Sequence, residues 1–139
     1  MAKSKSKYIA IDFDGTCVTH EYPEIGKDIG SIPILKEIVE NGHKLILFTM
    51  RHGEELDEAV NWFSDNGIKL YASQINPSQK FWTKSNKCYA NIYIDDAALG
   101  CPVIMDESIP NMYRDWETDR KSTRLNSSHS AKSRTPSSA

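Results

Sequence analysis

The run Lys7-Tyr8-Ile9-Ala10-Ile11-Asp12-Phe13-Asp14-Gly15-Thr16 decides the fold class expected for this chain. Its first half is a nearly continuous apolar segment, which predicts a β-strand over 7–13 that is buried on both faces. Strands of this kind are typical of parallel sheets covered by helices. The carboxylates and the glycine that follow predict that the strand ends in a polar turn.

Helix and strand patterns alternate along the rest of the chain. Ser31–Gly42 is expected to form a helix, because a capping serine and an early proline precede apolar residues at helical spacing and an Asn-Gly pair ends the pattern. A second helix is expected over Gly53–Asn66. The other expected elements are strands over Lys44–Thr49, Ile68–Ala72 and Asn91–Ile94, a polar connection over Ser73–Thr83 and a helical turn over Lys84–Tyr89. This alternation predicts an α/β fold with a doubly wound, Rossmann-like parallel sheet.

Composition and length exclude several classes of protein. The chain has 139 residues, of which 39% are hydrophobic and 26% are charged, as is typical of one soluble globular domain. No apolar run approaches the roughly 18 to 20 residues that cross a bilayer, so no membrane partner is expected. Cys17, Cys88 and Cys101 are odd in number and widely spaced, which suggests neither a disulfide framework nor a zinc site and favours a reducing, cytoplasmic location.

The C-terminal part differs in composition from the rest of the chain. From Asp119 to Ala139 it contains Leu125 and no other large apolar residue, so it is expected to be disordered. The string also resembles the in-frame translation of a sequencing-adapter oligonucleotide, which indicates an artefact. The expected folded core is 1–115, and the expected tail is 116–139. Residues 119–139 hold five basic residues and one acidic residue, which leaves a net charge of −6 on 1–118 and argues against broad nucleic-acid binding.

Polar residues follow three of the expected strands. They are Asp12 and Asp14 after the first strand, Thr49 and Arg51 after the second, and Asp95 and Asp96 after the fourth. Because parallel strands bring their carboxyl ends to one edge of a sheet, about four carboxylates are expected to crowd there. They repel one another unless a cation neutralises them, and oxygen ligands of this kind suit Mg²⁺. The sequence therefore predicts a magnesium site formed by Asp12, Asp14, Asp95 and Asp96.

An Asp-x-Asp pair allows a division of labour in phosphoryl transfer. Asp12 can attack phosphorus as the nucleophile, while Asp14 protonates the leaving group and then deprotonates water. Gly15 frees the turn after the strand, and it joins Thr49 and a lysine as an expected phosphate contact. Arg51 is either a second phosphate contact or a surface residue. An Asp-x-Asp-Gly segment taken alone is often only a turn, so the interpretation depends on the other strand ends.

The segment 12–16, Thr49, a downstream lysine and Asp95-Asp96 together resemble the four ordered motifs of the haloacid dehalogenase superfamily of phosphohydrolases, over about 7–102. The resemblance implies that Asp12 forms an aspartyl-phosphate, that Asp14 acts as acid and base, and that Thr49 binds phosphoryl oxygens. It also implies that Asp95 and Asp96 hold Mg²⁺ alongside Asp12 and the backbone carbonyl of Asp14. The lysine is Lys80, Lys84 or Lys87, and Lys87 is preferred because it leads directly into the last strand.

The resemblance is to small members of the superfamily that lack a cap domain, because the loop 17–30 and the connection 73–83 are too short to fold by themselves. An open site favours a phosphate on a bulky substrate, or closure by a second copy of the chain in a homo-oligomer. The expected function is that of a Mg²⁺-dependent phosphomonoesterase. Its expected substrate is a small phosphorylated molecule, as for a nucleotidase, or a phosphorylated nucleic-acid end.

Two other functions are weighed against this expectation. A non-catalytic regulatory module that binds phosphate or metal would keep the acidic residues, but it does not need an acid two residues after a nucleophile. A receiver-type signalling domain would carry its acidic pair before the phospho-accepting strand, whereas here Asp95-Asp96 comes last. The histidines do not add a third possibility, because His20, His43 and His52 share no metal-ligand spacing and are expected to be solvated or capping residues.

Overall fold

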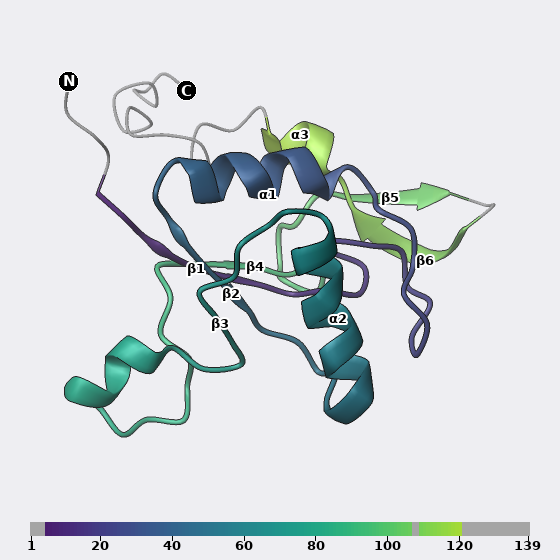
Figure 1. Ribbon diagram of the computed structural model, residues 1–139. Coiled ribbons are helices and arrows are strands. Elements are labelled where there is room, and N and C mark those ends of the chain that lie inside the picture. The colour runs from purple at the N-terminus through teal and green to yellow at the C-terminus, as the bar shows by residue number, and fades with distance from the viewer. Residues whose placement is uncertain (1–4, 107–108, 121–139) are drawn as a thin grey trace, which may run out of the picture.

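The computed structural model describes residues 5–106 and 109–120 (Figure 1). One parallel sheet contains β1 (Tyr8–Ile11), β2 (Lys44–Leu47), β3 (Ala72–Ser73) and β4 (Ile92–Ile94). The helices α1 (Ser31–Glu40) and α2 (Gly53–Asp65) follow β1 and β2, and the 3-10 helix η1 (Pro77–Phe81) lies between β3 and β4. An antiparallel pair, β5 (Val103–Asp106) and β6 (Ile109–Arg114), precedes the short helix α3 (Trp116–Arg120). The predicted α/β class with a parallel sheet is confirmed, and the arrangement is consistent with a Rossmann-like fold.

The strand order β3-β2-β1-β4 places β1 inside the sheet. Ile11 of β1 is in register with Leu47 of β2 on one side and with Ile94 of β4 on the other. The chain moves outward from β1 through β2 to β3, and then returns to the far side of β1 to form β4. This reversal between β1 and β4 is a topological switch point, where open α/β sheets form their ligand crevices.

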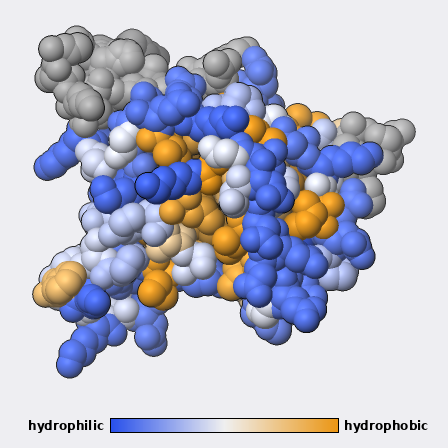
Figure 2. Space-filling model, in the orientation of Figure 1, coloured by the Kyte–Doolittle hydropathy of each residue, from blue (hydrophilic) through white to orange (hydrophobic). Residues whose placement is uncertain are grey.

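Helices α1 and α2 cover the same face of the sheet. Their apolar side chains form one core with alternate residues of the strands, a set that includes Ile9, Ile11, Leu45, Leu47, Ile34, Leu35, Ile38, Ala59 and Phe63. The outward surfaces of both helices are largely hydrophilic, and apolar residues lie between them (Figure 2). Both crossovers run in the same direction along the sheet, so their right-handed sense puts both helices on one face.

The opposite face of the sheet is contacted in part by irregular chain. It carries the other alternate set of strand residues, including the buried Ala10 and Ile46. Tyr8 on this face packs against Tyr89 of the β3–β4 connection, with ring centroids 5.8 Å apart. A doubly wound sheet predicts helices on both faces, but this connection contains only η1. The helical turn predicted over Lys84–Tyr89 is wrong, because side-chain hydrogen bonds fix this segment without a helical ladder.

The boundary predicted after residue 115 is also wrong. Trp116 begins α3, is 2% exposed and belongs to the apolar core. Its indole Nε1 donates a hydrogen bond of 2.6 Å to the carbonyl oxygen of Thr16. A single large aromatic residue thus anchors a segment that lacks an apolar pattern. The rest of the expected tail, 121–139, lies outside the described residues. Within the described ranges, no helix is long and apolar enough to span a membrane.

Candidate metal and phosphate site

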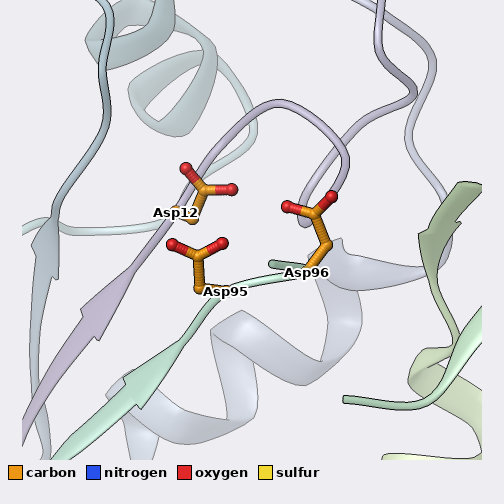
Figure 3. A group of neighbouring side chains, drawn as sticks. All are labelled: Asp12, Asp95 and Asp96. Carbon is orange, nitrogen blue, oxygen red and sulfur yellow. The ribbon is translucent and has the colours of Figure 1, made fainter. Parts of the chain in front are cut away.

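Three carboxylates meet at the carboxyl ends of β1 and β4 (Figure 3). They belong to Asp12, which follows β1, and to Asp95 and Asp96, which follow β4. One oxygen atom from each carboxylate lies within 4.8 Å of the other two, a spacing that one cation can bridge. The structure therefore brings together three of the four carboxylates that the strand ends predict. They lie at the switch point of the sheet.

Thr16 connects the ends of β1 and β4. Its side chain is fully buried, and its Oγ1 lies 2.9 Å from Oδ2 of Asp12 and 3.2 Å from Oδ1 of Asp96. The same oxygen accepts a hydrogen bond of 2.9 Å from the backbone N–H of Asp96. A hydroxyl has one proton, so it donates to one carboxylate at a time while it accepts from the backbone. Thr16 therefore fixes the relative position of two of the carboxylates.

The electrostatics of this acidic group favour a bound cation. Burial raises the pKa of Asp12 to about 8, with further contributions from the negative charge of Asp95 and from a hydrogen bond with Asp96. The ionised form is disfavoured because it is poorly solvated and faces another anion. A divalent cation would offset both effects. Three carboxylates form an all-oxygen donor set that suits Mg²⁺, which also takes waters and phosphate oxygens as ligands. The residues present therefore fit such a metal.

The carboxylate of Asp14 points to a different partner. Arg51 donates to it in a bidentate pair, from Nε to Oδ2 and from Nη2 to Oδ1, each at 2.8 Å. A planar guanidinium satisfies both carboxylate oxygens at once, so the pair holds the side chain firmly. The prediction that four side-chain carboxylates crowd one point is corrected to three. The metal contact that the resemblance implies for the backbone carbonyl of Asp14 stays a prediction.

Arg51 takes neither of its two predicted roles. Its side chain is 1% exposed, so it is not a surface residue. Besides the two bonds to Asp14, its remaining N–H groups donate to the carbonyl oxygens of Pro23, Glu24 and Glu55. All five donors of the guanidinium therefore have acceptors within the protein. Arg51 has no donor left for a phosphate in this arrangement.

Gly15 contributes space to the site rather than a phosphate contact. Its N–H donates to the carbonyl oxygen of Val18 at 2.7 Å and is not available to a phosphate, which corrects the predicted role. Its φ of +83° is a conformation that side chains disfavour. A Cβ here would collide with Nε2 of His20 and lie 2.6 Å from Oδ2 of Asp96. Glycine therefore allows His20 and Asp96 to meet over the turn.

His20 is a site residue that the sequence analysis missed. Its Nε2 lies 3.0 Å from Oδ2 of Asp96, and the side chain is 32% exposed. The contact with Asp96 was not predicted, and the expectation that His20 is solvated or caps rather than ligates a metal stays a prediction. Spacing among the histidines gives no signal for this contact, because the partner of His20 is a carboxylate 76 positions away in the chain. Proximity in the chain to the 12–16 segment was the available signal, because a tight turn after β1 returns the chain toward the strand ends.

Thr49 lies just beyond β2, and Gln74 fixes its backbone. The amide of Gln74 accepts from the N–H of Thr49 at 2.8 Å and donates to its carbonyl oxygen at 2.7 Å. Gln74 has a φ of 71°, which is uncommon for a residue other than glycine. The hydroxyl of Thr49 accepts from the N–H of Arg51 at 3.2 Å, which leaves its own proton for a phosphate oxygen. The predicted phosphate-binding role of Thr49 is compatible with this geometry and stays a prediction.

The candidate lysines all lie on the connection between β3 and β4, and their side chains are exposed. The Nζ of Lys87 lies over the ring of Tyr93, 5.5 Å from its centroid, whereas that of Lys80 lies over Phe81. Tyr93 belongs to β4, two residues before Asp95. Lys87 is therefore positioned against the strand that leads directly into two of the three clustered carboxylates. The preference for Lys87 over Lys80 and Lys84 stays a prediction.

A solved structure of a conserved protein coded by a locus of Bacteroides thetaiotaomicron is similar to this chain. The two share 38% sequence identity and a TM-score of 0.65, and the match covers 75% of this chain and 85% of the other. No protein-family model and no curated protein matches the sequence. The similarity to the solved structure extends over sequence as well as fold.

Proposed function

The chain belongs to the same family as this Bacteroides thetaiotaomicron protein, and from the geometry of its site we propose that it is a Mg²⁺-dependent phosphohydrolase of haloacid dehalogenase type. The position of Asp12 carries this proposal. Asp12 directly follows the interior strand β1 at the switch point. One of its carboxylate oxygens lies within 4.8 Å of an oxygen of Asp95 and of Asp96, a spacing that one cation can bridge. From this position Asp12 can attack the phosphorus atom of an ester, and the three carboxylates would hold a cation that stabilises charge on the phosphate oxygens. The assignment of this Rossmann-like fold to the haloacid dehalogenase type is part of the same proposal.

Asp12 is the proposed nucleophile. One of its oxygens bonds to phosphorus, the P–O bond to the leaving group breaks, and the leaving oxygen takes a proton. Water then attacks the phosphorus of the aspartyl-phosphate, which releases inorganic phosphate and restores the carboxylate. Mg²⁺, when bound, would neutralise charge on the phosphate oxygens and on the three carboxylates. Thr49 and Lys87 would hold phosphoryl oxygens through a hydroxyl and an ammonium group.

Asp14 is the proposed acid and base, and its pairing with Arg51 constrains how it acts. Each oxygen of Asp14 accepts one hydrogen bond from Arg51, and a carboxylate oxygen has a second lone pair. Asp14 can therefore take a proton from the attacking water on an outward lone pair without leaving Arg51. Asp14 in its protonated form would give a proton to the leaving group from the same outward lone pair. Arg51 fixes the orientation of this lone pair.

A screen of phosphate monoesters with and without Mg²⁺ tests the proposal. We expect turnover with Mg²⁺, its loss in excess chelator and its recovery when the metal is restored. Ca²⁺ should inhibit, because its larger and looser coordination shell misplaces the phosphate. Asp12→Asn should abolish turnover, whereas Asp57→Asn, an exposed position on α2, is the matched control and should retain it. Acid-quenched protein should carry phosphate on Asp12. Full turnover in chelator or in Asp12→Asn would contradict the mechanism.

The engagement of Asp14 by Arg51 also supports a second candidate function. A module that binds a metal and a phosphate without hydrolysing an ester needs no free acid, and here both oxygens of Asp14 are bound. Such a module would bind inorganic phosphate in a Mg²⁺-dependent manner and turn over no ester in the screen. Turnover that depends on Asp12 would exclude it.

A further inference from the structure

An aromatic hollow lies on the face of the sheet that the helices leave uncovered, beside the strand β4 that leads into Asp95 and Asp96. It has a volume of about 350 Å³, and Trp82, Tyr89 and Tyr93 contribute rings to its lining. The rings of Trp82 and Tyr89 meet edge to face, with centroids 5.3 Å apart. Trp82 is 62% exposed, Tyr93 40% and Tyr89 36%. Much of their aromatic surface is therefore open to a ligand.

Strand geometry places one wall of this hollow, Tyr93, on the same side of the sheet as Asp12 and Asp95. Tyr93 precedes Asp95 by two residues, so the two side chains leave β4 on the same face, about 7 Å apart along the strand. Ala10, which is in register with Tyr93, precedes Asp12 by two residues on β1. The alternation of side chains therefore directs both Asp12 and Asp95 toward the face on which the hollow lies.

The wall of the hollow is fixed before any ligand binds. Gln79 is buried, and its amide donates to the carbonyl oxygens of Ser85 and Lys87 and accepts from the N–H of Tyr89. The hydroxyl of Tyr93 donates to the carbonyl oxygen of Cys88 at 2.6 Å. These bonds hold the irregular segment against β4. A preformed site loses little conformational entropy when it binds a ligand.

The charge of this segment suits a phosphorylated ligand. Residues 74–91 contain three lysines and no acidic residue, although 1–118 carry a net charge of −6. Lys87 lines the hollow, with its Nζ over the ring of Tyr93, the residue of β4 two positions before Asp95. Aromatic rings interleaved with lysines are the surface on which bases stack while their phosphates are neutralised.

We propose that the hollow binds the aromatic base of the leaving group, so that the substrate is a nucleoside monophosphate unit. This inference rests on the proposed function and names its substrate class. The base stacks within the hollow, where Tyr93 is the ring two residues before Asp95 along β4, and the phosphate reaches Asp12 past Lys87. The sugar bridges the interval of about two residues along β4. Free nucleotides and the terminal nucleotide of a strand share this chemistry.

A matched pair of substrates tests the role of the hollow. Adenosine 5′-monophosphate and ribose 5-phosphate carry the same sugar phosphate and differ in the base. With Mg²⁺ present, base stacking should raise kcat/KM for the nucleotide roughly tenfold to a hundredfold. Trp82→Ala should bring the ratio of the two values close to one. Phe81→Ala is the control, because Phe81 is the neighbouring aromatic residue, is 82% exposed and does not line the hollow. It should retain the ratio.

The outcomes separate this inference from the proposed function. Equal kcat/KM for both esters in the unaltered protein would overturn the role of the hollow and leave the phosphohydrolase intact. Calorimetry on Asp12→Asn measures binding of the same two compounds without turnover. If the unaltered protein hydrolyses neither ester but the nucleotide binds through Trp82, the phosphohydrolase fails and the base site stands. A lower KM for a 5′-phosphorylated oligonucleotide than for the free nucleotide would identify the end of a nucleic-acid strand as the substrate. A lower KM for the free nucleotide would identify free nucleotides as the substrate.

Discussion

Gly15 occupies a position where a methyl group would strike the ring of His20 and crowd Asp96. We expect Gly15→Ala to destabilise the protein by more than Gly42→Ala, since Gly42 also has a positive φ, of +92°, but has open space around its Cβ position. The control should lose about 1 to 2 kcal/mol of unfolding free energy, from backbone strain alone. Gly15→Ala should lose about 1 to 3 kcal/mol more through steric overlap, together with most of any phosphatase activity. Urea unfolding measures the difference, and equal losses would show that the turn relaxes freely.

The raised pKa of Asp12 predicts a pH dependence of stability in the metal-free protein. Between the ordinary carboxyl pKa of 3.8 and the folded-state pKa of about 8, the folded chain binds a proton that the unfolded chain does not. The free energy of unfolding should therefore fall as the pH rises through this window and level off above it. Asp12→Asn should remove this component, and saturating Mg²⁺ should suppress it, because the cation takes the place of the proton.

Urea unfolding in chelator, from about pH 5 to about pH 9, gives the test. Other carboxylates and histidines contribute to the pH dependence of both proteins, so the difference between the unaltered protein and Asp12→Asn is the quantity of interest. The same dependence of the unfolding free energy on pH in both proteins would show that burial does not perturb the pKa of Asp12.

At the scale of elements, Arg51 joins three segments that are separate in the chain. Its guanidinium binds Asp14 after β1, the carbonyls of Pro23 and Glu24 in the following loop, and the carbonyl of Glu55 in the first turn of α2. We expect Arg51→Met to cost about 3 to 5 kcal/mol of unfolding free energy, because it leaves the partly buried carboxylate of Asp14 without its counter-charge.

A double-mutant cycle with Asp14→Asn isolates this pair. The loss in the double variant should be smaller than the sum of the single losses by about 1 to 3 kcal/mol. Lys44→Met is the control for the removal of a cation, since Lys44 lies over the ring of Tyr71 and is expected to cost about 1 kcal/mol or less. Strict additivity of Arg51→Met and Asp14→Asn would mean that the two side chains do not couple in solution.

At the scale of the whole molecule, Trp116 determines where the folded unit ends. A chain cut after Asp115 should lose about 3 to 5 kcal/mol, because it removes a buried tryptophan from the core. Removal of 121–139 should leave stability unchanged, since that part of the sequence contains only one large apolar residue. Trp116→Phe should cost less, about 1 to 3 kcal/mol, because it leaves the carbonyl of Thr16 without its donor. Thermal melts of the three variants give the order, and equal melting temperatures for the two truncations would contradict it.

The sequence by itself determined the first two strands, the two long helices and the location of the candidate site. Hydrophobic periodicity and end signals are local, so α1, α2, β1 and β2 were predicted within a few residues of their bounds. Because parallel strands align their carboxyl ends, the meeting of Asp12 with Asp95 and Asp96 also followed from positions in the chain.

The partners of individual side chains were decided only by the tertiary structure. Arg51 binds Asp14 across 37 positions, His20 meets Asp96 across 76, and Trp116 reaches Thr16 across 100. None of these pairs has a fixed spacing, because each depends on how a loop or a terminal segment returns to the sheet. The sequence therefore predicted four clustered carboxylates and a free arginine, whereas the fold gives three carboxylates and pairs the fourth with that arginine. Loop conformation made the difference, since it allows one guanidinium to satisfy both oxygens of Asp14 and three backbone carbonyls at once.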